Sequence, residues 1–291
     1  MKVGIIGGSG LYDLEALEEK REERITTSMG DPSDSYVAGK IGGVEVFFLP
    51  RHGKGHRLLP SEINYRANIM GLKMLGVERV LSVSAVGSLR EDLRPRDIVL
   101  PDQYFDRTKA DDEHTFFGGG IVAHVSFAEP TCPALRAAIA AAARKVVAAK
   151  GADVRVNESG TYVNMAGPAF STKAESHTYR KLGFDIIGMT SLVEAKLCRE
   201  AELCYQSMSM VTDYDCWRES EEAVSVDMVI GHLVANTGLA KDILVELVPT
   251  LPEDPGCGCG TALATAMITK GNLVPSETKE RLAPIIGKYM T

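Results

Sequence analysis

Apolar runs of strand length alternate with longer segments of helical periodicity along most of the chain. The runs that predict strands are KVGIIG, VEVFFLP, RVLSVSA, DIVLP, TYVNMAG, FDIIGMT and CYQSMSMV. The segments that predict helices are NYRANIMGLKMLG, PALRAAIAAAARKVVAAKG and SLVEAKLCREAE. This alternation predicts a mainly parallel sheet with helices on both faces. In such sheets ligands bind beyond the carboxyl ends of the strands, so chemistry is expected in the residues that follow each apolar run.

Length and charge narrow the classes of protein. The 291 residues are 45% hydrophobic, and no Ser/Pro-rich linker or charge block divides them, which favours one α/β domain. The net charge of −7 is spread along the chain and excludes the basic footprint of a nucleic-acid binder. No apolar stretch reaches the roughly 18 residues of a membrane span, and the start resembles no signal peptide. We therefore expect a soluble cytoplasmic protein.

The six cysteines are scattered, unlike the dense framework of a small secreted domain. Cys257 and Cys259 form the only close pair, and neither a second pair nor suitably spaced histidines follow them. We therefore expect no metal. The CGC stretch is either a Gly-rich loop with two thiols or a redox-active, disulfide-forming tail.

Four predicted strand ends carry groups that bind anions. They offer the glycine N–H groups and Ser9 hydroxyl of GGSG, Arg51 and His52 of PRHGKGH, Ser84 of SAVGS, and Thr190 of GMTS. Taken alone, GGSG is equally consistent with a plain tight turn, and PRHGKGH with a solvated basic turn. Four such ends together predict an oxyanion pocket for phosphate or a similar small anion, without metal.

The stretch TDYDCW places two acids after an apolar run. In a strand, Asp213 and Asp215 would lie about 6.6 Å apart on one face while Tyr214 points to the other. Two acceptors match adenine, whose amino group and protonated N7 are donors. The alternative is a helix N-cap or a solvated turn, but three glutamates already precede the helix predicted near Ser225.

Several motifs in order resemble the 5′-methylthioadenosine phosphorylases of the trimeric purine nucleoside phosphorylase superfamily. The resemblance extends over roughly residues 1 to 248, and the tail resembles the CxC ending of archaeal-type members. The resemblance rests on the motifs GIIGGSGL, RHGKGH with PSEINYRAN, SAVGSLRE, DQYFDRT, ESGTYVNMAGPAFSTKAES, GMTSLVEAKLCREAELCY and VTDYDCWRESEEAVSVD.

The resemblance implies phosphorolysis of methylthioadenosine to adenine and 5-methylthioribose 1-phosphate, in purine and methionine salvage. It implies a nucleoside phosphorylase-like catalytic domain over 1–250, with 251–291 as a C-terminal loop and helical extension packed on the same domain. Inorganic phosphate would be a co-substrate, and no cofactor, nucleic acid or membrane would take part. A homotrimer or hexamer with sites at subunit interfaces is expected.

The resemblance also assigns roles to individual residues. Asp215 would be the general acid at N7, Asp213 would accept from the 6-amino group, Phe170 would stack on the base, and Met189 would lie against the ribose. The phosphate-binding positions would be Ser9, Arg51, His52, Ser84, Ala85 and Thr190; the remaining substrate-binding positions would be Ser171, Tyr214, Val226, Val229 and, completing a neighbouring subunit's site, His124.

Two alternatives stay open. A phosphorylase for 6-oxopurine nucleosides or methylthioinosine would use a related pocket, although such relatives usually carry Asn in place of an acid. A non-catalytic nucleoside-binding protein would use the same pocket without the acid.

Overall fold

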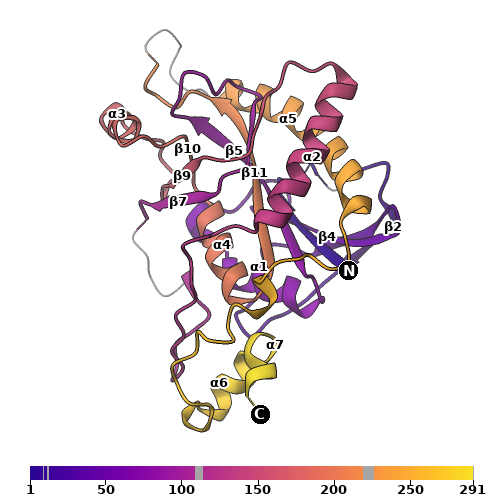
Figure 1. The fold of residues 1–291 in the computed structure, drawn as a ribbon, viewed down its shortest axis with the longest axis vertical. Helices are drawn as coiled ribbons and strands as arrows, with labels where there is room; N and C mark the ends of the chain where they lie inside the picture. Colours follow the sequence, from indigo (N-terminus) through magenta and orange to yellow (C-terminus); the bar gives the residue numbers. More distant parts are fainter. Residues whose placement is uncertain (9, 12, 109–113, 219–225, 291) are drawn as a thin grey trace.

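The computed structural model describes residues 1–8, 10–11, 13–108, 114–218 and 226–290, except for the side chains of 226–230 (Figure 1). Its strands are β1 (Lys2–Gly7), β2 (Glu18–Glu23), β3 (Tyr36–Ile41), β4 (Val44–Pro50), β5 (Arg79–Ser88), β6 (Ile98–Val99), β7 (Gln103–Asp106), β8 (Val156–Asn157), β9 (Thr161–Asn164), β10 (Ile186–Gly188) and β11 (Cys204–Asp213). Its α-helices are α1 (Tyr65–Met74), α2 (Pro133–Lys150), α3 (Lys173–Lys181), α4 (Ser191–Glu200), α5 (Val226–Leu247), α6 (Ser276–Arg281) and α7 (Ala283–Ile286). Short 3₁₀ turns are η1 (Pro60–Glu62), η3 (Val248–Thr250), η4 (Cys259–Thr261), η5 (Gly271–Leu273) and η6 (Gly287–Tyr289).

The described strands form one mixed, eleven-stranded sheet. Its main path runs β2-β3-β4-β1-β5-β10-β9-β7, while β11 pairs with β5 and leads on to β6 and β8. β4, β1, β5 and β11 are parallel to one another. β10 runs antiparallel to β5. The sheet is therefore mixed and largely parallel around its central strand β5, as the sequence predicts.

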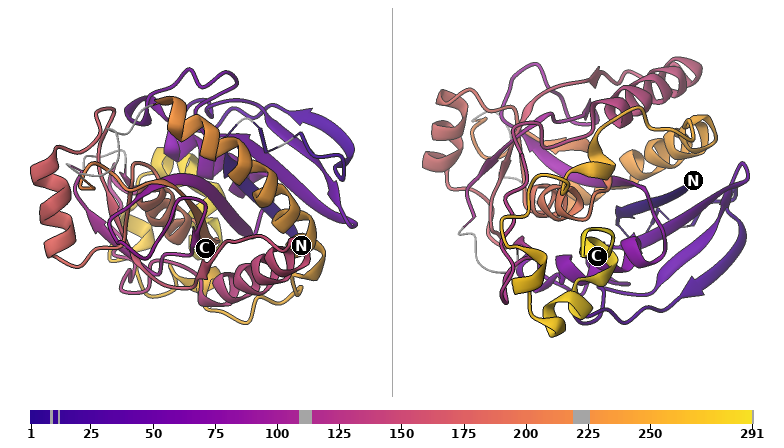
Figure 2. Two further views of the ribbon diagram at one scale, coloured as in Figure 1. Left: turned by 90° about the horizontal axis from the view of Figure 1, so that it is seen from above. Right: turned by 60° about the horizontal axis from the view of Figure 1, so that its bottom comes forward.

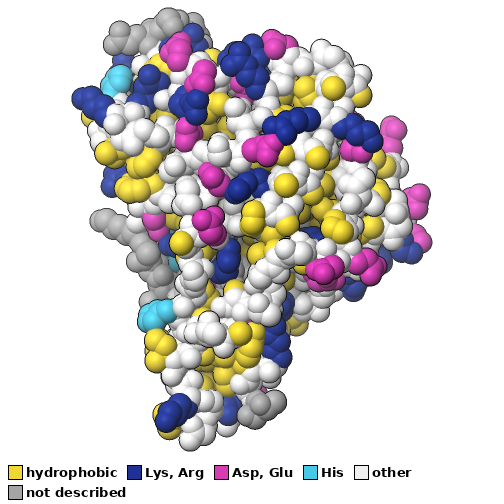
Figure 3. Space-filling view, in the orientation of Figure 1, with side chains coloured by type: hydrophobic (Ala, Val, Ile, Leu, Met, Phe, Trp, Pro, Cys, Tyr) yellow, Lys and Arg dark blue, Asp and Glu magenta, His cyan; other side chains and the backbone are white. Residues whose placement is uncertain are grey.

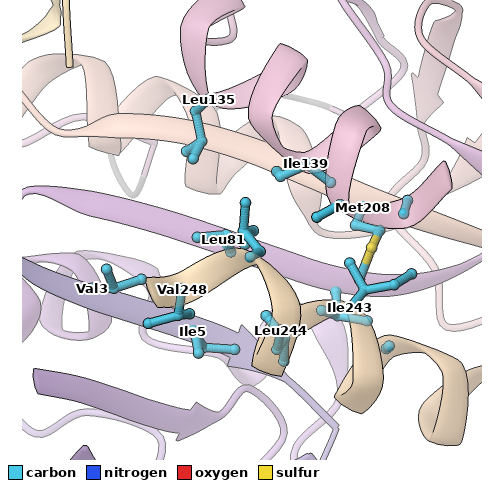
Figure 4. Close-up of a cluster of buried hydrophobic side chains, with 14 of the residues drawn as sticks. Val3, Ile5, Leu81, Leu135, Ile139, Met208, Ile243, Leu244 and Val248 are labelled. Carbon is cyan, nitrogen blue, oxygen red and sulfur yellow. The ribbon is translucent and has the colours of Figure 1, made fainter. Parts of the chain in front are cut away.

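Helices cover both faces of the sheet. Successive strand residues point to opposite faces, so Ile5 packs in one core cluster and Ile6 in the other. The first cluster joins β1, β5 and β11 to α2 and α5, and Figure 4 shows Leu135, Ile139, Ile243 and Leu244 reaching toward the sheet. The second cluster joins the opposite face to α1, α4 and the C-terminal segment.

The chain after α5 returns along the sheet and ends on α1. Leu263, Leu282 and Ile286 are buried in the second core cluster beside Ile69 of α1. Figure 2 shows α6 and α7 on the side of the molecule away from α2 and α5. Across the residues the structure describes, no helix is long and apolar enough to cross a membrane.

Several elements depart from the sequence-based expectation. β2 is missed because all six residues of its sequence, EEKREE, are charged and five of them are exposed, which is typical of an edge strand. α3 is missed because only Ser176 and Tyr179 of its nine residues are buried. DIVLP and FDIIGMT supply only the short strands β6 and β10.

Candidate active site

The parallel strands bring the predicted anion-binding segments to one edge of the sheet. β1 and β4 end level with each other, with Gly7 opposite Pro50, and the Arg51 N–H donates to the Gly7 carbonyl at 3.0 Å. β5 is buried along its length except at half-buried Ser84 and exposed Ala85. An opening in the middle of a central strand is unusual, and it makes Ser84 and Ala85 candidate contacts for a ligand.

The antiparallel course of β10 brings Thr190 to the same opening. Ile187 pairs with Gly87, so the chain beyond β10 runs back toward Ala85 and Ser84. Thr190 is buried and is the N-cap of α4, whose first N–H groups and positive dipole end favour an anion. The Ser84 hydroxyl lies 3.5 Å from that of Ser191, the first residue of α4. Sequence reasoning found the Thr190 hydroxyl but missed the helix N-terminus behind it.

The buried side-chain amide of Asn164 holds the junction between β10 and α4 in place. Asn164, at the end of β9, accepts a hydrogen bond from the Leu192 N–H at 3.3 Å and donates to the Met189 carbonyl at 3.3 Å. Gly188 is needed because a Cβ there would meet the Tyr162 hydroxyl at 2.0 Å. Asn164 therefore sets the direction in which α4 leaves the site, a role that sequence reasoning did not assign.

Arg51 is placed differently from the expectation of an open guanidinium fork. It is 3% exposed and pairs with Glu194 of α4, which is 1% exposed. Its Nη2 also donates to the Ser82 hydroxyl at 2.6 Å, and its Nη1 donates to the Val83 carbonyl at 3.2 Å. Burial alone would lower the pKa of Arg51, but the Glu194 carboxylate reverses the effect and raises it. Within the described part of the chain, four of its five N–H groups are engaged, which makes the second Nη1 hydrogen a candidate donor to an anion.

Glu194 is the centre of this network. Its Oε2 accepts hydrogen bonds from the Ser82 hydroxyl at 2.6 Å and from the Tyr205 hydroxyl at 2.9 Å. The network ties β4, β5, β11 and α4 together beneath the opening at Ser84. Sequence reasoning missed Glu194 because its partner Arg51 lies 143 residues away in the chain.

His52 is half-buried beside Arg51, and its Nδ1 lies 2.8 Å from the Leu58 carbonyl. A carbonyl only accepts, so Nδ1 carries the proton. Burial, with the nearby Arg51 charge, lowers the pKa of His52 to about 4. At neutral pH its Nε2 is therefore an acceptor, whereas the sequence-based expectation was a donor. Ser9, also predicted to bind phosphate, lies outside the described residues.

The two acids have unequal environments. β11 ends at Asp213, and Asp215 adopts a left-handed backbone with φ of 53°, so the prediction of two acids on one strand face is wrong. Asp213 accepts from the Thr212 hydroxyl at 2.7 Å and from the Asp215 N–H at 2.8 Å. Asp215 Oδ2 is buried without a hydrogen-bond partner in the described part of the chain. Burial raises the pKa of both carboxyls.

Gly87 lets the acidic turn lie against β5. A Cβ at Gly87 would meet Asp213 Oδ1 at 3.0 Å and Asp215 Cβ at 3.4 Å. Trp217 anchors the same turn by donating from Nε1 to the Ser88 carbonyl at 2.8 Å. The sequence pattern places SAVGS at a strand end, but β5 continues to Ser88, and Gly87 inside the strand allows this close approach.

The loop predicted to hold the base lies next to this turn. The Cys216 thiol donates to the Ser171 carbonyl at 3.2 Å. The nearby Ser176 and Ser171 hydroxyls lower the pKa of Asp215 and so offset part of the rise that burial causes. Phe170 is 54% exposed, which leaves its ring available for stacking on a ligand. Met189 packs against this loop, and its sulfur lies 2.6 Å from the position that a Cβ on Gly167 would occupy.

Four further residues are predicted to bind substrate, and two of them, Tyr214 and His124, do not face this opening. The Tyr214 ring is buried in a cluster with Trp217, so it supports the turn from inside. His124 is exposed, and its N–H donates to the Ala266 carbonyl in the C-terminal segment at 2.9 Å. Val226 and Val229 lie in α5, but their side chains are not among those described.

The distribution of charge on the outer surface favours a local anion site over a general attraction for anions. On the face shown in Figure 3, basic and acidic side chains are interspersed and no large patch of one sign forms. Attraction for an anion must therefore come from local donors such as those at Ser84, Thr190 and the start of α4.

Comparison with known proteins agrees with this geometry. A family model described as the phosphorylase superfamily matches residues 2–249. The chain is 54% identical to S-methyl-5′-thioadenosine phosphorylase of Koribacter versatilis, covering 99% of this chain and 96% of the relative. It is 52% identical to the enzyme of the same name from Geobacter sulfurreducens, covering 99% of each chain.

Solved structures give the same result. A methylthioadenosine phosphorylase from an antarctic soil metagenomic library superposes with a TM-score of 0.92 at 48% identity, covering 97% of this chain and 98% of the other. The Schistosoma mansoni methylthioadenosine phosphorylase in complex with adenine superposes with a TM-score of 0.83 at 40% identity, covering 91% and 96%. The chain belongs to the S-methyl-5′-thioadenosine phosphorylase family of the phosphorylase superfamily.

Proposed function

We propose that the chain catalyses phosphorolysis of S-methyl-5′-thioadenosine to adenine and 5-methylthioribose 1-phosphate. The observation that carries the proposal is the buried Oδ2 of Asp215, which has no hydrogen-bond partner among the described residues, on a side chain whose Cβ lies against Gly87, two residues from the opening at Ala85. The names of the relatives that match over nearly the whole chain support the same reaction. The reaction uses inorganic phosphate as co-substrate and requires no cofactor.

The phosphate would lie between the middle of β5 and the start of α4. Ser84, Thr190 and the first N–H groups of α4 donate to its oxygens, with the remaining Nη1 hydrogen of Arg51. His52 Nε2 accepts the hydrogen of the P–OH group carried by HPO₄²⁻. This division of donors and one acceptor matches the hydrogen-bonding pattern of that anion.

The mechanism separates charge between two ends of the site. As the bond from C1′ to N9 breaks, its electron pair leaves with the purine, and a phosphate oxygen forms the new bond to C1′. Phosphate stabilises the cationic sugar, while a proton from Asp215 reaches N7 of the leaving base. Burial raises the pKa of Asp215, which favours the protonated form that this step needs.

Base specificity follows from Asp213. Each of its oxygens already accepts one internal hydrogen bond and retains capacity for another, which suits the 6-amino group of adenine. A 6-oxopurine would place an acceptor against that carboxylate.

A substrate panel at saturating phosphate tests this proposal. Methylthioadenosine, adenosine and inosine are compared by release of the free base. We expect rapid release of adenine from methylthioadenosine, weaker activity on adenosine, and little hypoxanthine. Preferential cleavage of inosine would instead support a 6-oxopurine phosphorylase. Binding of methylthioadenosine with no product would support a non-catalytic nucleoside-binding protein.

We also propose a homotrimer or hexamer in which His124 completes a neighbouring site. Its exposed position and its pairing with Ala266, away from the strand ends, support a role between subunits. Sedimentation of the purified chain tests the assembly: a monomer that retains full activity would contradict it.

A further inference from the structure

Four cysteines from three distant parts of the chain meet at the end of the sheet opposite the candidate active site. Cys132 is the N-cap of α2, Cys204 begins β11, and Cys257 and Cys259 belong to the C-terminal segment at η4. Their four sulfur atoms all lie within 4.8 Å of one another. The sequence offers no second pair downstream of the CGC stretch, but the fold supplies the two missing thiols from upstream.

The spacing of the sulfurs matches a single tetrahedral metal ion. Zinc bound to four thiolates at about 2.3 Å places each pair of sulfurs about 3.8 Å apart. Cys204 and Cys257 have a sulfur separation of 3.4 Å, well beyond the roughly 2.05 Å of a disulfide. Four thiolates in a closed tetrahedral set are typical of a structural zinc site.

The surroundings favour thiolates at this position. Cys132, Cys204 and Cys259 are buried, and Cys132 stands at the positive end of the eighteen-residue helix α2. The positive end of α2 therefore favours a thiolate at Cys132, and its sulfur lies within 4.8 Å of the other three.

A buried cation lies in the same layer. Arg79 is the register partner of Cys204 across β5 and β11, so both side chains lie on the same face of the sheet. Its Nη2 donates to the Glu253 carbonyl at 3.0 Å, which ties down the segment leading to Cys257. This charge partly offsets the net double negative charge of a four-thiolate zinc site.

We propose that Cys132, Cys204, Cys257 and Cys259 bind one zinc ion. Binding would displace the remaining thiol protons into solvent, one from each neutral thiol, and would form four zinc–sulfur bonds. The ion would fasten the C-terminal segment to α2 and β11. Because nine residue steps of β11 place Cys204 about 30 Å from Asp213, the role is structural and independent of the proposed reaction.

Metal analysis of the purified chain is the direct test. The chain is produced without a metal-affinity tag, kept under a non-chelating reductant, desalted and analysed for zinc and iron. We expect one zinc per chain. Replacement of zinc by Co²⁺ should give the intense visible absorption of a tetrahedral thiolate site.

Variants locate the ion. Cys204→Ser and Cys259→Ser should lose most of the zinc and lower the thermal midpoint. Cys216→Ser, which changes a thiol outside the cluster, should keep one zinc per chain. Circular dichroism confirms that each variant is folded, and the zinc and cobalt measurements on the unchanged chain do not depend on any variant.

Three results would overturn the proposal. Disulfides among these cysteines, seen as protection from alkylation that only a reductant removes, would exclude the thiolate site. Four freely alkylated thiols with neither zinc nor a cobalt spectrum would show an empty cluster. Iron in place of zinc would show that the metal is wrong.

Discussion

At the residue scale, the contrast between Asp213 and Asp215 carries the chemistry. Asp213 uses both oxygens to hold the turn, whereas Asp215 keeps a buried Oδ2 without a partner among the described residues. The sequence identified both acids because they directly follow a long apolar run. The strand pattern did not separate their roles, which came from the family resemblance alone, because the left-handed backbone of Asp215 breaks the strand alternation that the pattern assumes.

Replacing the unpartnered acid tests its role. Asp215→Asn removes the proton donor but keeps the size of the side chain, so kcat should fall about 10²- to 10⁴-fold while KM for methylthioadenosine changes much less. Steady-state kinetics at saturating phosphate measure both constants. Asp153→Asn, at a carboxylate paired with Arg94 on the surface, is the matched control and should behave like the unchanged chain. A near-normal kcat for Asp215→Asn would remove it from the acid role.

At the element scale, the anion site depends on how β10 and α4 meet β5. Sequence patterns place Thr190 at a strand end and predict a mainly parallel sheet, but they do not indicate which strands run antiparallel. The antiparallel pairing of Ile187 with Gly87 is a long-range contact that no local pattern encodes. The same applies to the ion pair of Arg51 with Glu194, which joins residues 143 positions apart. Local apolar patterns therefore identify the segments of the site, and the tertiary pairings decide what each side chain contacts.

The ion pair should stabilise α4 against the sheet. Glu194→Ala leaves Arg51 buried and without its carboxylate, so the free energy of unfolding should fall by about 3–5 kcal/mol. Urea denaturation measures the change. Glu246→Ala removes the half-buried partner of the exposed Lys145 and should cost no more than about 1 kcal/mol. Equal small effects of both substitutions would show that the buried pair does not hold α4.

At the scale of the whole molecule, long-range packing joins segments that the sequence pattern separates. The C-terminal segment enters the core through Leu263 and Leu282, and the residues before α2 are held by Glu200. Local periodicity predicts the central sheet well because its strands are apolar on both faces. It predicts the charged edge strand β2 poorly, because pairing with β3 rather than burial of side chains defines that strand.

Glu200 should make stability depend on pH. Its carboxylate accepts from the Phe116 N–H at 2.7 Å and from the Thr115 hydroxyl at 2.8 Å, yet burial raises its pKa to about 7 from an ordinary value of 4.5. The folded state holds this proton more tightly than the unfolded state, so stability is lost as pH rises from about 4.5 to about 7. The loss amounts to about 3 kcal/mol.

Glu200→Gln imitates the protonated acid and should remove this part of the pH dependence. Thermal midpoints of the variant and the unchanged chain, measured between pH 5 and pH 8, should diverge as pH rises, with the variant the more stable. Glu280→Gln, at an exposed position on α6, provides the control. Parallel curves for the variant and the unchanged chain would contradict the raised pKa.

The central claim is that phosphate at the β5–α4 opening and the acid at the end of β11 act on one nucleoside. The most direct measurement is release of adenine from methylthioadenosine with and without inorganic phosphate, with the sugar product identified by ³¹P NMR. We predict release that depends on phosphate and accumulation of 5-methylthioribose 1-phosphate. Equal release without phosphate, with free methylthioribose as the product, would contradict the account and indicate a hydrolase.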